Sequence, residues 1–470
     1  MICSQENNER EEIIMPKRPV SATLTNSSVD VINAIRNSAS INYQNYVPVA
    51  TPDADSIREI GAIICDDPQL YNEFMGILAT RIYKVIVTSK MYENPWTVFK
   101  KGIVEFGEKI EDIFIDLAKP HTYDPENAYA NELKRELPNI HTAFYVMNYQ
   151  KFYKVTTTQA ELKTAFLALD GITNFITKAI TSMYSAANYD EYQVMKYMLA
   201  RTIINGGLYP VTAGAISAAD AKTVVSKVKQ ISNDLTFMKK TYNRVGVYNQ
   251  TLKDNQYIII DSTFDAIMDV EVLASAFNMD KVTFMGHRIL VDGFGNVDGD
   301  RLRELFDGET TTYTALTDAQ KSALNAIPCV IVDENFFQIY DNLIETGEDY
   351  VKEGLYWNNW LHNWKTFAVS PFSNAIAFLP SAPSVSAVAV SPSTATMAKN
   401  ARGQFTASVT MTGFGSKEVV WSVPAGAKAS VDSRGVVTIA SDAVSESTIT
   451  LTATSVQDGT VAGTATITIA

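Results

Sequence analysis

The clearest pattern of apolar positions lies between residues 160 and 206. Apolar side chains recur there at steps of three and four, as they do on one face of an α-helix. The stripe consists of Leu162, Phe166, Leu169, Ile172 or Thr173, Ile176, Ile180 and Met183. Asp190 can begin a second helix, which the glycines at 206 and 207 end. The segment therefore predicts a core-facing helix with one continuous stripe, followed by a second helix.

Helical spacing also marks the N-terminal region, after a polar and charged stretch over residues 1–30 that we expect to be a mobile arm. Ser27 or Ser28 can cap a helix. The apolar residues on the face of that helix are Val31, Ile32 and Ile35. A later helical run passes through Leu70, Phe74 and Leu78. Strand-like spacing follows at residues 82–89.

Residues 94–156 form a long polar and aromatic excursion between regular elements. The stretch 94–107 predicts an extended segment with a turn at Lys101 and Gly102. Residues 146–158 alternate apolar and polar side chains, which is typical of a strand. Because long, weakly apolar excursions are uncommon within compact domains, we expect an arm that contacts another molecule.

The remainder of the chain predicts a mixed α+β body and an all-β C-terminal domain. Helices are expected at 221–238 and 270–279, and strands at 256–262, 288–294 and 328–342. Residues 354–381 return with dense aromatic side chains at strand spacing. After a Pro/Ser-rich linker that begins at Ser381, short alternating segments with turn signals continue to the end.

Composition and charge narrow the class of protein. The 470 residues carry a formal net charge of −13, which is the wrong sign for gripping DNA phosphates. Cys3, Cys65 and Cys329 are too scattered for a disulfide framework, so we expect folding in a reducing compartment. The first residues lack the pattern of a secretory signal, and no apolar run reaches the roughly 20 residues of a membrane span. We expect a soluble protein of two or three domains.

Few residues offer catalytic or metal-binding chemistry. The four histidines stand outside zinc-binding spacings, and there is no nucleophile elbow or phosphate loop. A calcium loop would use Asn296, Asp298, Asp300 and Asp307. However, Arg301 occupies the position where such a loop needs Gly, and the last ligand should be Glu. A Gly/Asp/Asn turn explains the same residues, and we favour it. We expect no catalytic site and no cofactor.

Two stretches are candidates for subunit contacts. Phe99, Lys100 and Lys101 form a small basic segment that is either a solvated turn or an arm tip docking on an acidic neighbour. The second stretch carries Trp357, Trp360 and Trp364. Stacked rings suit a sugar, but we favour a core or subunit contact, because aromatic side chains dominate burial energetics.

A resemblance to a known family rests on short stretches that follow in order over roughly residues 30 to 380. They are VINAIRNS, YVPVA, FKKG, RELPN, LKTAF, DEYQVMKYML, VEVLASAFNM, VDGF, VDENFFQIYDNL and GLYWNNW with AVSPFSNAIAF. Together they resemble the major capsid protein of phi29-like short-tailed phages. The C-terminal residues resemble a group 2 bacterial immunoglobulin-like domain, through VSP at 390–392, GQFTA at 403–407, WS at 421–422, VD at 431–432, GVV at 435–437 and the closing TATITI.

The resemblance implies a Hong Kong 97-type capsid fold with an N-terminal arm, an extended hairpin arm, a spine helix, a peripheral domain and an axial domain. The capsid domain would cover residues 31–380 and the immunoglobulin-like sandwich residues 381–470. Within the capsid domain the implied parts are the arm within 94–156, with FKKG near its tip, the spine and following helix at 160–206, the axial domain at 209–340 and the return to the peripheral sheet at 341–380.

The resemblance also implies a structural role and its partners. Many copies would assemble as hexamers and pentamers into an icosahedral or prolate shell around packaged double-stranded DNA, without binding it specifically and without a membrane. A scaffolding protein and a portal would be partners, and assembly would take place in the cytoplasm of the bacterial host. The immunoglobulin-like domain would lie on the outside of the virion and contact host-surface glycans or a head fibre.

Two other functions remain as alternatives. A bacterial surface or carbohydrate-binding protein with an immunoglobulin-like module needs an export signal, which the N-terminus lacks. A hydrolase with an appended β domain needs a catalytic constellation, and the sequence offers none.

Deleting residues 384–470 is expected to leave a body that still folds and assembles, because the linker is rich in Pro and Ser and the C-terminal domain should have its own core. Soluble yield and negative-stain microscopy, with and without a scaffolding partner, measure this. Loss of all soluble protein would contradict the prediction.

Overall fold

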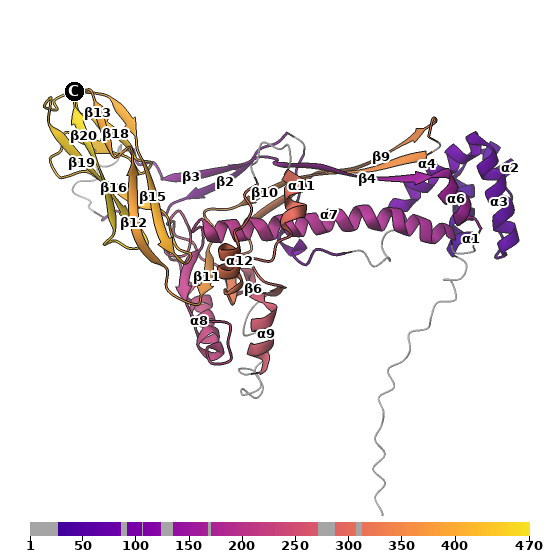
Figure 1. Ribbon diagram of the computed structural model, residues 1–470, viewed down its shortest axis with the longest axis horizontal. Coiled ribbons are helices and arrows are strands. Elements are labelled where there is room, and N and C mark those ends of the chain that lie inside the picture. The colour runs from indigo at the N-terminus through magenta and orange to yellow at the C-terminus, as the bar shows by residue number, and fades with distance from the viewer. Residues whose placement is uncertain are drawn as a thin grey trace, which may run out of the picture. The chain divides into compact units, whose positions relative to one another are not determined.

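The structure, a computed structural model, describes residues 27–85, 92–105, 107–123, 135–167, 171–270, 287–306, 313–354 and 356–470 (Figure 1). The chain divides into two compact units. The first consists of residues 1–92, 152–186 and 346–361, and the second of residues 93–151, 187–345 and 362–470. The chain passes between the units once between residues 92 and 93 and otherwise within four elements: α7 (Gly171–Ile204), β4 (Tyr149–Thr158), β9 (Phe337–Val351) and β10 (Tyr356–Val369).

The first unit is mainly helical and has its own core. Its helices, beside part of α7, are α1 (Ser27–Ser38), α2 (Ile41–Tyr46), α3 (Ala54–Asp66), α4 (Pro68–Val85) and α6 (Gln159–Ala165). The predicted apolar faces are confirmed, since the core includes Ile32, Ile35, Leu70, Phe74 and Leu78. Helix α1 begins at Ser27, so the last residues of the expected mobile arm are helical, while residues 1–26 lie outside the described residues.

Helix α4 corrects one prediction of the sequence. It continues to Val85, so the strand-like spacing expected from residue 82 is wrong for its first four residues. The remaining residues, 86–89, lie outside the described residues. Isoleucine, tyrosine and valine favour strands only weakly, and a helix that is already formed and packed overrides this preference.

Helix α7 corrects another prediction, because it is one continuous helix of 34 residues. Asp190 does not begin a second helix. Its buried carboxylate accepts hydrogen bonds from Nε and Nη2 of Arg301, at 2.8 and 2.9 Å, so it serves as an ion-pair partner in mid-helix. The segment 160–206 therefore consists of the short α6 followed by the long α7. From the predicted stripe, Phe166 and Met183 are buried, Leu169 lies outside the described residues, and the other side chains are not described.

The second unit contains a five-stranded sheet in the order β5-β11-β8-β6-β7. The strands are β5 (Tyr209–Thr212), β6 (Gln256–Asp261), β7 (His287–Val291), β8 (Cys329–Asp333) and β11 (Ala375–Leu379). Helices α8 (Ala221–Asp234), α9 (Ser262–Met268), α11 (Gly299–Phe306) and α12 (Asp318–Asn325) accompany it. The two faces of this sheet pack against different hydrophobic cores. Ile258 of β6 and Ile331 of β8 belong to one core, and their neighbours Ile259 and Val330 belong to the other. Burial on both faces explains the continuous apolar runs.

A second sheet has the order β1-β9-β10-β4, and it confirms the strand expected at 146–158 as β4. Strand β1 (Lys100–Ile103) pairs in parallel with β9, with an irregular register between Lys100 and Gly102. The turn predicted at Lys101 and Gly102 is therefore wrong. Gly102 has a φ of +123°, a conformation that glycine adopts most easily, so the glycine marks a bulge in a strand. The helix expected at 270–279 lies almost wholly outside the described residues.

The C-terminal part of the second unit is an all-β sandwich with its own core, which includes Val388, Phe405, Val437 and Leu451. It has a pair β12-β15, a sheet β13-β20-β19-β16 and a sheet β14-β18-β17. The strands are β12 (Ser384–Ser391), β13 (Thr394–Met397), β14 (Arg402–Gln404), β15 (Thr406–Thr412), β16 (Val419–Ser422), β17 (Ala429–Val431), β18 (Val436–Ile439), β19 (Thr448–Ser455) and β20 (Ala462–Ile469).

Two helical glycines of the first unit provide a matched test of its packing. A Cβ on Gly61 of α3 would lie 2.5 Å from Cβ of Phe166, whereas one on Gly76 of α4 would be 3.5 Å from its nearest neighbour. We expect Gly61→Ala to lower the free energy of unfolding by roughly 1–3 kcal/mol through overpacking. Gly76→Ala should be neutral or stabilising by up to about 1 kcal/mol, because alanine favours the helix. Equal effects in chemical denaturation would contradict this packing.

Candidate functional site

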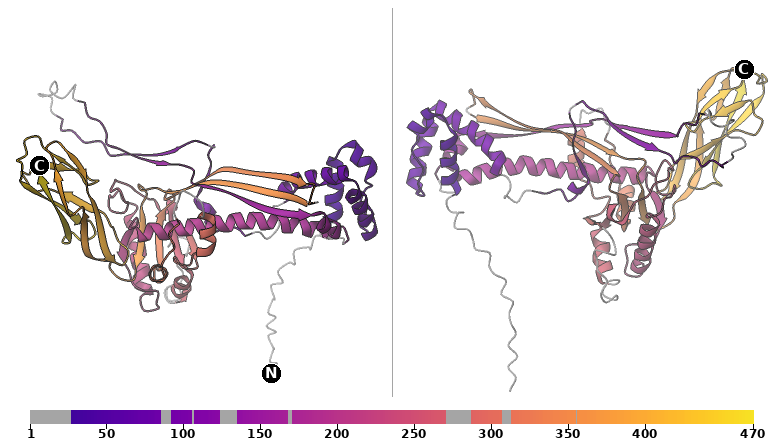
Figure 2. Two further views of the ribbon diagram at one scale, coloured as in Figure 1. Left: turned by 45° about the horizontal axis from the view of Figure 1, so that its top comes forward. Right: turned by 180° about the vertical axis from the view of Figure 1, so that it is seen from behind.

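A two-stranded hairpin in the second unit exposes an apolar face. Strands β2 (Ile110–Ile115) and β3 (Ile140–Tyr145) pair antiparallel and run side by side in the views of Figure 2. Residues opposite each other in such a pair point to the same face. On one face the pairs are Ile115 with Ile140, Ile113 with Thr142, and Glu111 with Phe144. All six are exposed, and we call them the hairpin face.

The exposure of the hairpin face is unusual for its composition. Ile113, Ile115, Ile140 and Phe144 are 53, 58, 54 and 57% exposed. Contiguous exposed apolar side chains on a soluble protein mark an interaction surface more often than isolated ones do. A lone two-stranded ribbon is also only marginally stable in water. The hairpin face therefore has the chemistry of a surface that becomes buried against a partner.

The opposite face of the hairpin is held by the rest of the second unit. Oδ2 of Asp112 accepts hydrogen bonds from Oη of Tyr145 at 2.8 Å and Oγ of Ser370 at 2.6 Å. The ring of Phe114 lies 6.0 Å from that of Phe372. Burial, followed by the hydrogen bond to Asp112, raises the pKa of Tyr145, which remains a neutral donor at physiological pH. These contacts fix which face of the hairpin points outward.

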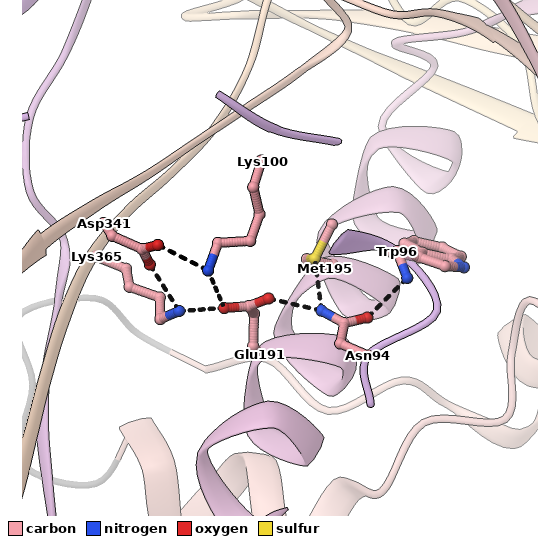
Figure 3. Close-up of polar contacts among 7 residues, drawn as sticks. All are labelled: Asn94, Trp96, Lys100, Glu191, Met195, Asp341 and Lys365. Carbon is pink, nitrogen blue, oxygen red and sulfur yellow. Dashed lines mark hydrogen bonds and ion pairs between the residues drawn. The ribbon is translucent and has the colours of Figure 1, made fainter. Parts of the chain in front are cut away.

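A buried charge cluster joins β1, β9 and β10 to α7 within the same unit (Figure 3). Lys100 Nζ lies 2.7 Å from Oδ2 of Asp341 and 3.3 Å from Oε2 of Glu191. Lys365 Nζ lies 2.8 Å from Oδ1 of Asp341 and also contacts Glu191. On the other side, Nδ2 of Asn94 donates to Oε1 of Glu191 at 2.7 Å. Two positive and two negative charges thus cancel.

Burial makes this cancellation necessary. The side chains of Glu191 and Lys365 are 2 and 4% exposed, so an unpaired charge there would be costly. Burial alone would raise the pKa of Asp341, but the charge of Lys365 and the hydrogen bond from Lys100 outweigh it and hold the pKa below its ordinary value. For Lys100, burial acts downward, yet Glu191 and Asp341 outweigh it and raise the pKa.

The two pKa shifts set the pH range of the cluster. Asp341 has the lower pKa when folded, so its contribution is present above its ordinary pKa of 3.8 and is lost as the pH falls through the folded value. Lys100 has the higher pKa when folded, so its contribution is complete below 10.5 and is lost as the pH rises through the folded value. Between these limits the contributions of Asp341 and Lys100 are both complete.

The structure corrects the prediction of a basic arm tip at residues 99–101. Phe99 is fully buried, with its ring 4.7 Å from that of Phe337 and 5.1 Å from that of Tyr257, so it has no surface for a neighbour. Lys100 belongs to the charge cluster. Lys101 Nζ donates to the carbonyl oxygen of Glu334 at 2.7 Å, and its role as a subunit contact stays a prediction.

The three tryptophans have different environments. Trp357 is buried in the core of the first unit, with its ring 5.2 Å from that of Tyr350, so the core interpretation is confirmed there. Trp360 is partly buried, with the ammonium of Lys154 5.6 Å from its ring centroid. Trp364 is partly buried as well. For these last two, a subunit contact stays a prediction.

The described candidates for a calcium loop do not converge on one point. Oδ1 of Asp298 accepts a hydrogen bond from the backbone N of Arg301 at 3.0 Å, at the start of α11. Asp300 is exposed and forms an ion pair with Arg303 at 2.9 Å. Oδ1 of Asn296 accepts from Asn325. Asp307 lies outside the described residues, and the described part of the chain holds no group of three or more acidic, His or Cys side chains placed for a metal.

A buried lysine provides a positive charge beside this acidic turn. The buried Lys196 donates to the backbone oxygen of Asn296 at 2.6 Å and contacts the carboxylate of Asp292. The ammonium group therefore supplies the positive charge that the acidic turn needs. Burial lowers the pKa of Lys196, and the carboxylate of Asp292 opposes this effect. The contacts of these described residues support the turn interpretation.

Comparison with known proteins identifies the family. A family model for the Phi29-like phage major capsid protein matches residues 32–379. The chain belongs to this family. The major capsid proteins of Bacillus phages B103 and PZA are 35 and 32% identical to it over 430 and 429 residues, and each match covers 90% of the chain and 89% of the relative. The model of the group 2 bacterial immunoglobulin-like domain matches residues 384–468.

A solved capsid supports the fold. The capsid structure of Staphylococcus phage Andhra matches with a TM-score of 0.50 and 17% identity, covering 63% of this chain and 87% of that chain. The capsid protein thus has the α+β Hong Kong 97-type fold followed by an all-β immunoglobulin-like domain, and it is a shell component of a phage virion. The alternative of a bacterial surface protein is not favoured. Among the described helices, none is both long and apolar enough to span a bilayer.

Removing one charge from the cluster tests how much the cluster contributes to the stability of the fold. We expect Lys365→Met to lower the free energy of unfolding at neutral pH by roughly 3–5 kcal/mol, because two carboxylates then share one cation in a buried place. The matched control is Lys428→Met, which removes an ion pair whose partners are 54 and 63% exposed. It should cost at most about 1 kcal/mol. Denaturant titration of both variants measures this, and equal losses would contradict the assignment.

Proposed function

We propose that the hairpin face binds a neighbouring copy of the capsid protein, and that this contact is a main driving force of shell assembly. The carrying observation is the row of four exposed apolar side chains on a ribbon whose other face is already anchored. Family membership supports a second copy as the partner, since capsid proteins assemble into shells of many copies. Many weak copies of one contact add up to a stable closed particle.

Apolar contact also suits the charge of the protein. Each copy carries a formal charge of −13, so long-range electrostatics oppose the approach of two copies. Burial of Ile113, Ile115, Ile140 and Phe144 acts only at contact and is not screened by salt. We therefore expect assembly to become easier as salt rises, because salt screens the repulsion and leaves the apolar contact intact.

We infer the parts of the capsid fold as follows. The β2–β3 hairpin would be the extended arm, α7 the spine helix, and the sheet β5-β11-β8-β6-β7 the centre of the axial domain. Their residue ranges support this, since they fall within the segments 94–156, 160–206 and, apart from β11, 209–340.

We also propose a purely structural role, with hexamers and pentamers that assemble in the host cytoplasm with a scaffolding protein and a portal. The immunoglobulin-like domain would bind a host-surface glycan or a head fibre. The acidic charge would keep packaged DNA from adhering to the shell. Tight, salt-dependent binding of duplex DNA by purified shells would overturn this last point.

The double variant Ile113→Thr with Phe144→Thr tests the proposed contact. Threonine keeps the preference for a strand but removes apolar surface worth on the order of 1–2 kcal/mol per side chain. We expect an unchanged circular dichroism spectrum and melting temperature of the dissociated protein, and a loss of shells of about tenfold or more in sedimentation and negative-stain microscopy.

The control for this experiment is Val420→Thr, which changes an exposed strand residue of the sandwich in the same way. It should assemble like the unchanged protein. A hairpin variant that folds and still forms shells at the unchanged yield would disprove the proposed contact.

A further inference from the structure

One side chain of the immunoglobulin-like domain packs outside that domain. Phe414 lies in the loop between β15 and β16, yet its ring packs against the core of the capsid body that contains Leu208 and Phe337. The core of the sandwich is built from other residues, such as Phe405 and Leu451. Both partners belong to the second unit. The sequence gives the loop as Gly413-Phe414-Gly415, an aromatic ring between two glycines.

The backbones on the two sides of this contact approach closely. A Cβ on Gly206, two residues after the end of α7, would lie 2.1 Å from the carbonyl oxygen of Gly415. Gly206 also has a φ of +73°, so two independent constraints favour glycine at this position. A Cβ on Gly415 would instead meet side-chain ends of its own domain, 2.7 Å from Oε1 of Gln457, so this glycine is confined by the sandwich itself. Gly206 could therefore not take a side chain without moving the contact apart.

Polar contacts and the linker help to position the immunoglobulin-like domain on the capsid body, but they contribute little binding free energy. Nε of Arg244 lies 3.1 Å from Oε1 of Glu418, with the side chains 54 and 48% exposed, so this ion pair contributes little free energy. Pro383, at the end of the short connection from β11 to β12, lies against Gly413. Beside the contact, a cleft of about 400 Å³ separates residues such as Lys240 from Gln457. The contact is therefore narrow, and Phe414 is its apolar centre.

We propose that Phe414 anchors the immunoglobulin-like domain to the capsid body, so that the domain is held at a second point besides the linker. A domain held at two points presents its surface in a fixed orientation, whereas a domain on one linker would reorient freely. Sequence composition alone predicts that the immunoglobulin-like domain folds independently and is attached only by its linker. The anchor does not depend on how shells assemble, so it can be tested on the dissociated protein.

Hydrogen–deuterium exchange of the variant Phe414→Ala tests the anchor. If the anchor exists, amides of residues 413–418 are slowed in the unchanged protein, because the contact with the capsid body covers this loop. We expect Phe414→Ala to speed their exchange about tenfold, which corresponds to 1.4 kcal/mol. Amides of β19 should keep their protection, which shows that the sandwich itself stays folded.

The control is Val444→Ala, an exposed apolar residue of the same domain that should leave exchange at residues 413–418 unchanged. If Phe414→Ala unfolds the sandwich, Gly206→Ala takes its place, since it disturbs the contact from the side of the body and should speed exchange at 413–418. Unchanged exchange at 413–418 in the folded variants would overturn the proposal. The proposal would also be overturned if the amides of residues 413–418 were already unprotected in the unchanged protein.

Discussion

The hairpin face is apolar surface that the described part of the chain leaves open to water. Ile113, Ile115, Ile140 and Phe144 would be a liability on a protein that works alone, because exposed apolar strands invite unspecific pairing. The contacts around the hairpin instead indicate a binding surface that is held in a fixed position. Asp112 and Ser370 hold the opposite face, and a neutral cluster of two lysines and two carboxylates fixes the neighbouring strands to α7. A rigid support lets one face meet many identical partners in the same geometry.

The buried charges of this protein are paired, whereas its overall charge is far from neutral. Where charges are buried, they are matched: Lys100 and Lys365 face Glu191 and Asp341, and Lys196 fills the acidic turn at Asp292. Across the whole chain the charge is strongly negative. The matched interior avoids the cost of unpaired buried charges, while the unmatched charge keeps separate copies apart until an apolar contact overcomes the repulsion. Specificity of assembly would then come from the shape of the contact.

Sequence patterns predict the elements that bury one continuous face, and they miss the contacts between distant residues. Apolar spacing gives the helices around Ile32 and Phe74 and the strand at 256–261, because each forms by local periodicity against one core. The pattern misplaced Asp190, since a carboxylate that starts a helix and one that pairs with Arg301 look alike in sequence. The charge cluster could not be found, as its members lie at 100, 191, 341 and 365 and no local spacing relates them. The alternation of Ile113 with Ile115 was a usable signal, but sequence does not show which face stays open.

A reconstruction of the assembled shell at side-chain resolution tests the central claim most directly. The account predicts that Ile113, Ile115, Ile140 and Phe144 of each copy are covered by a neighbouring copy in every type of capsomer. It would be contradicted by closed shells in which the hairpin face remains in contact with solvent or with packaged DNA.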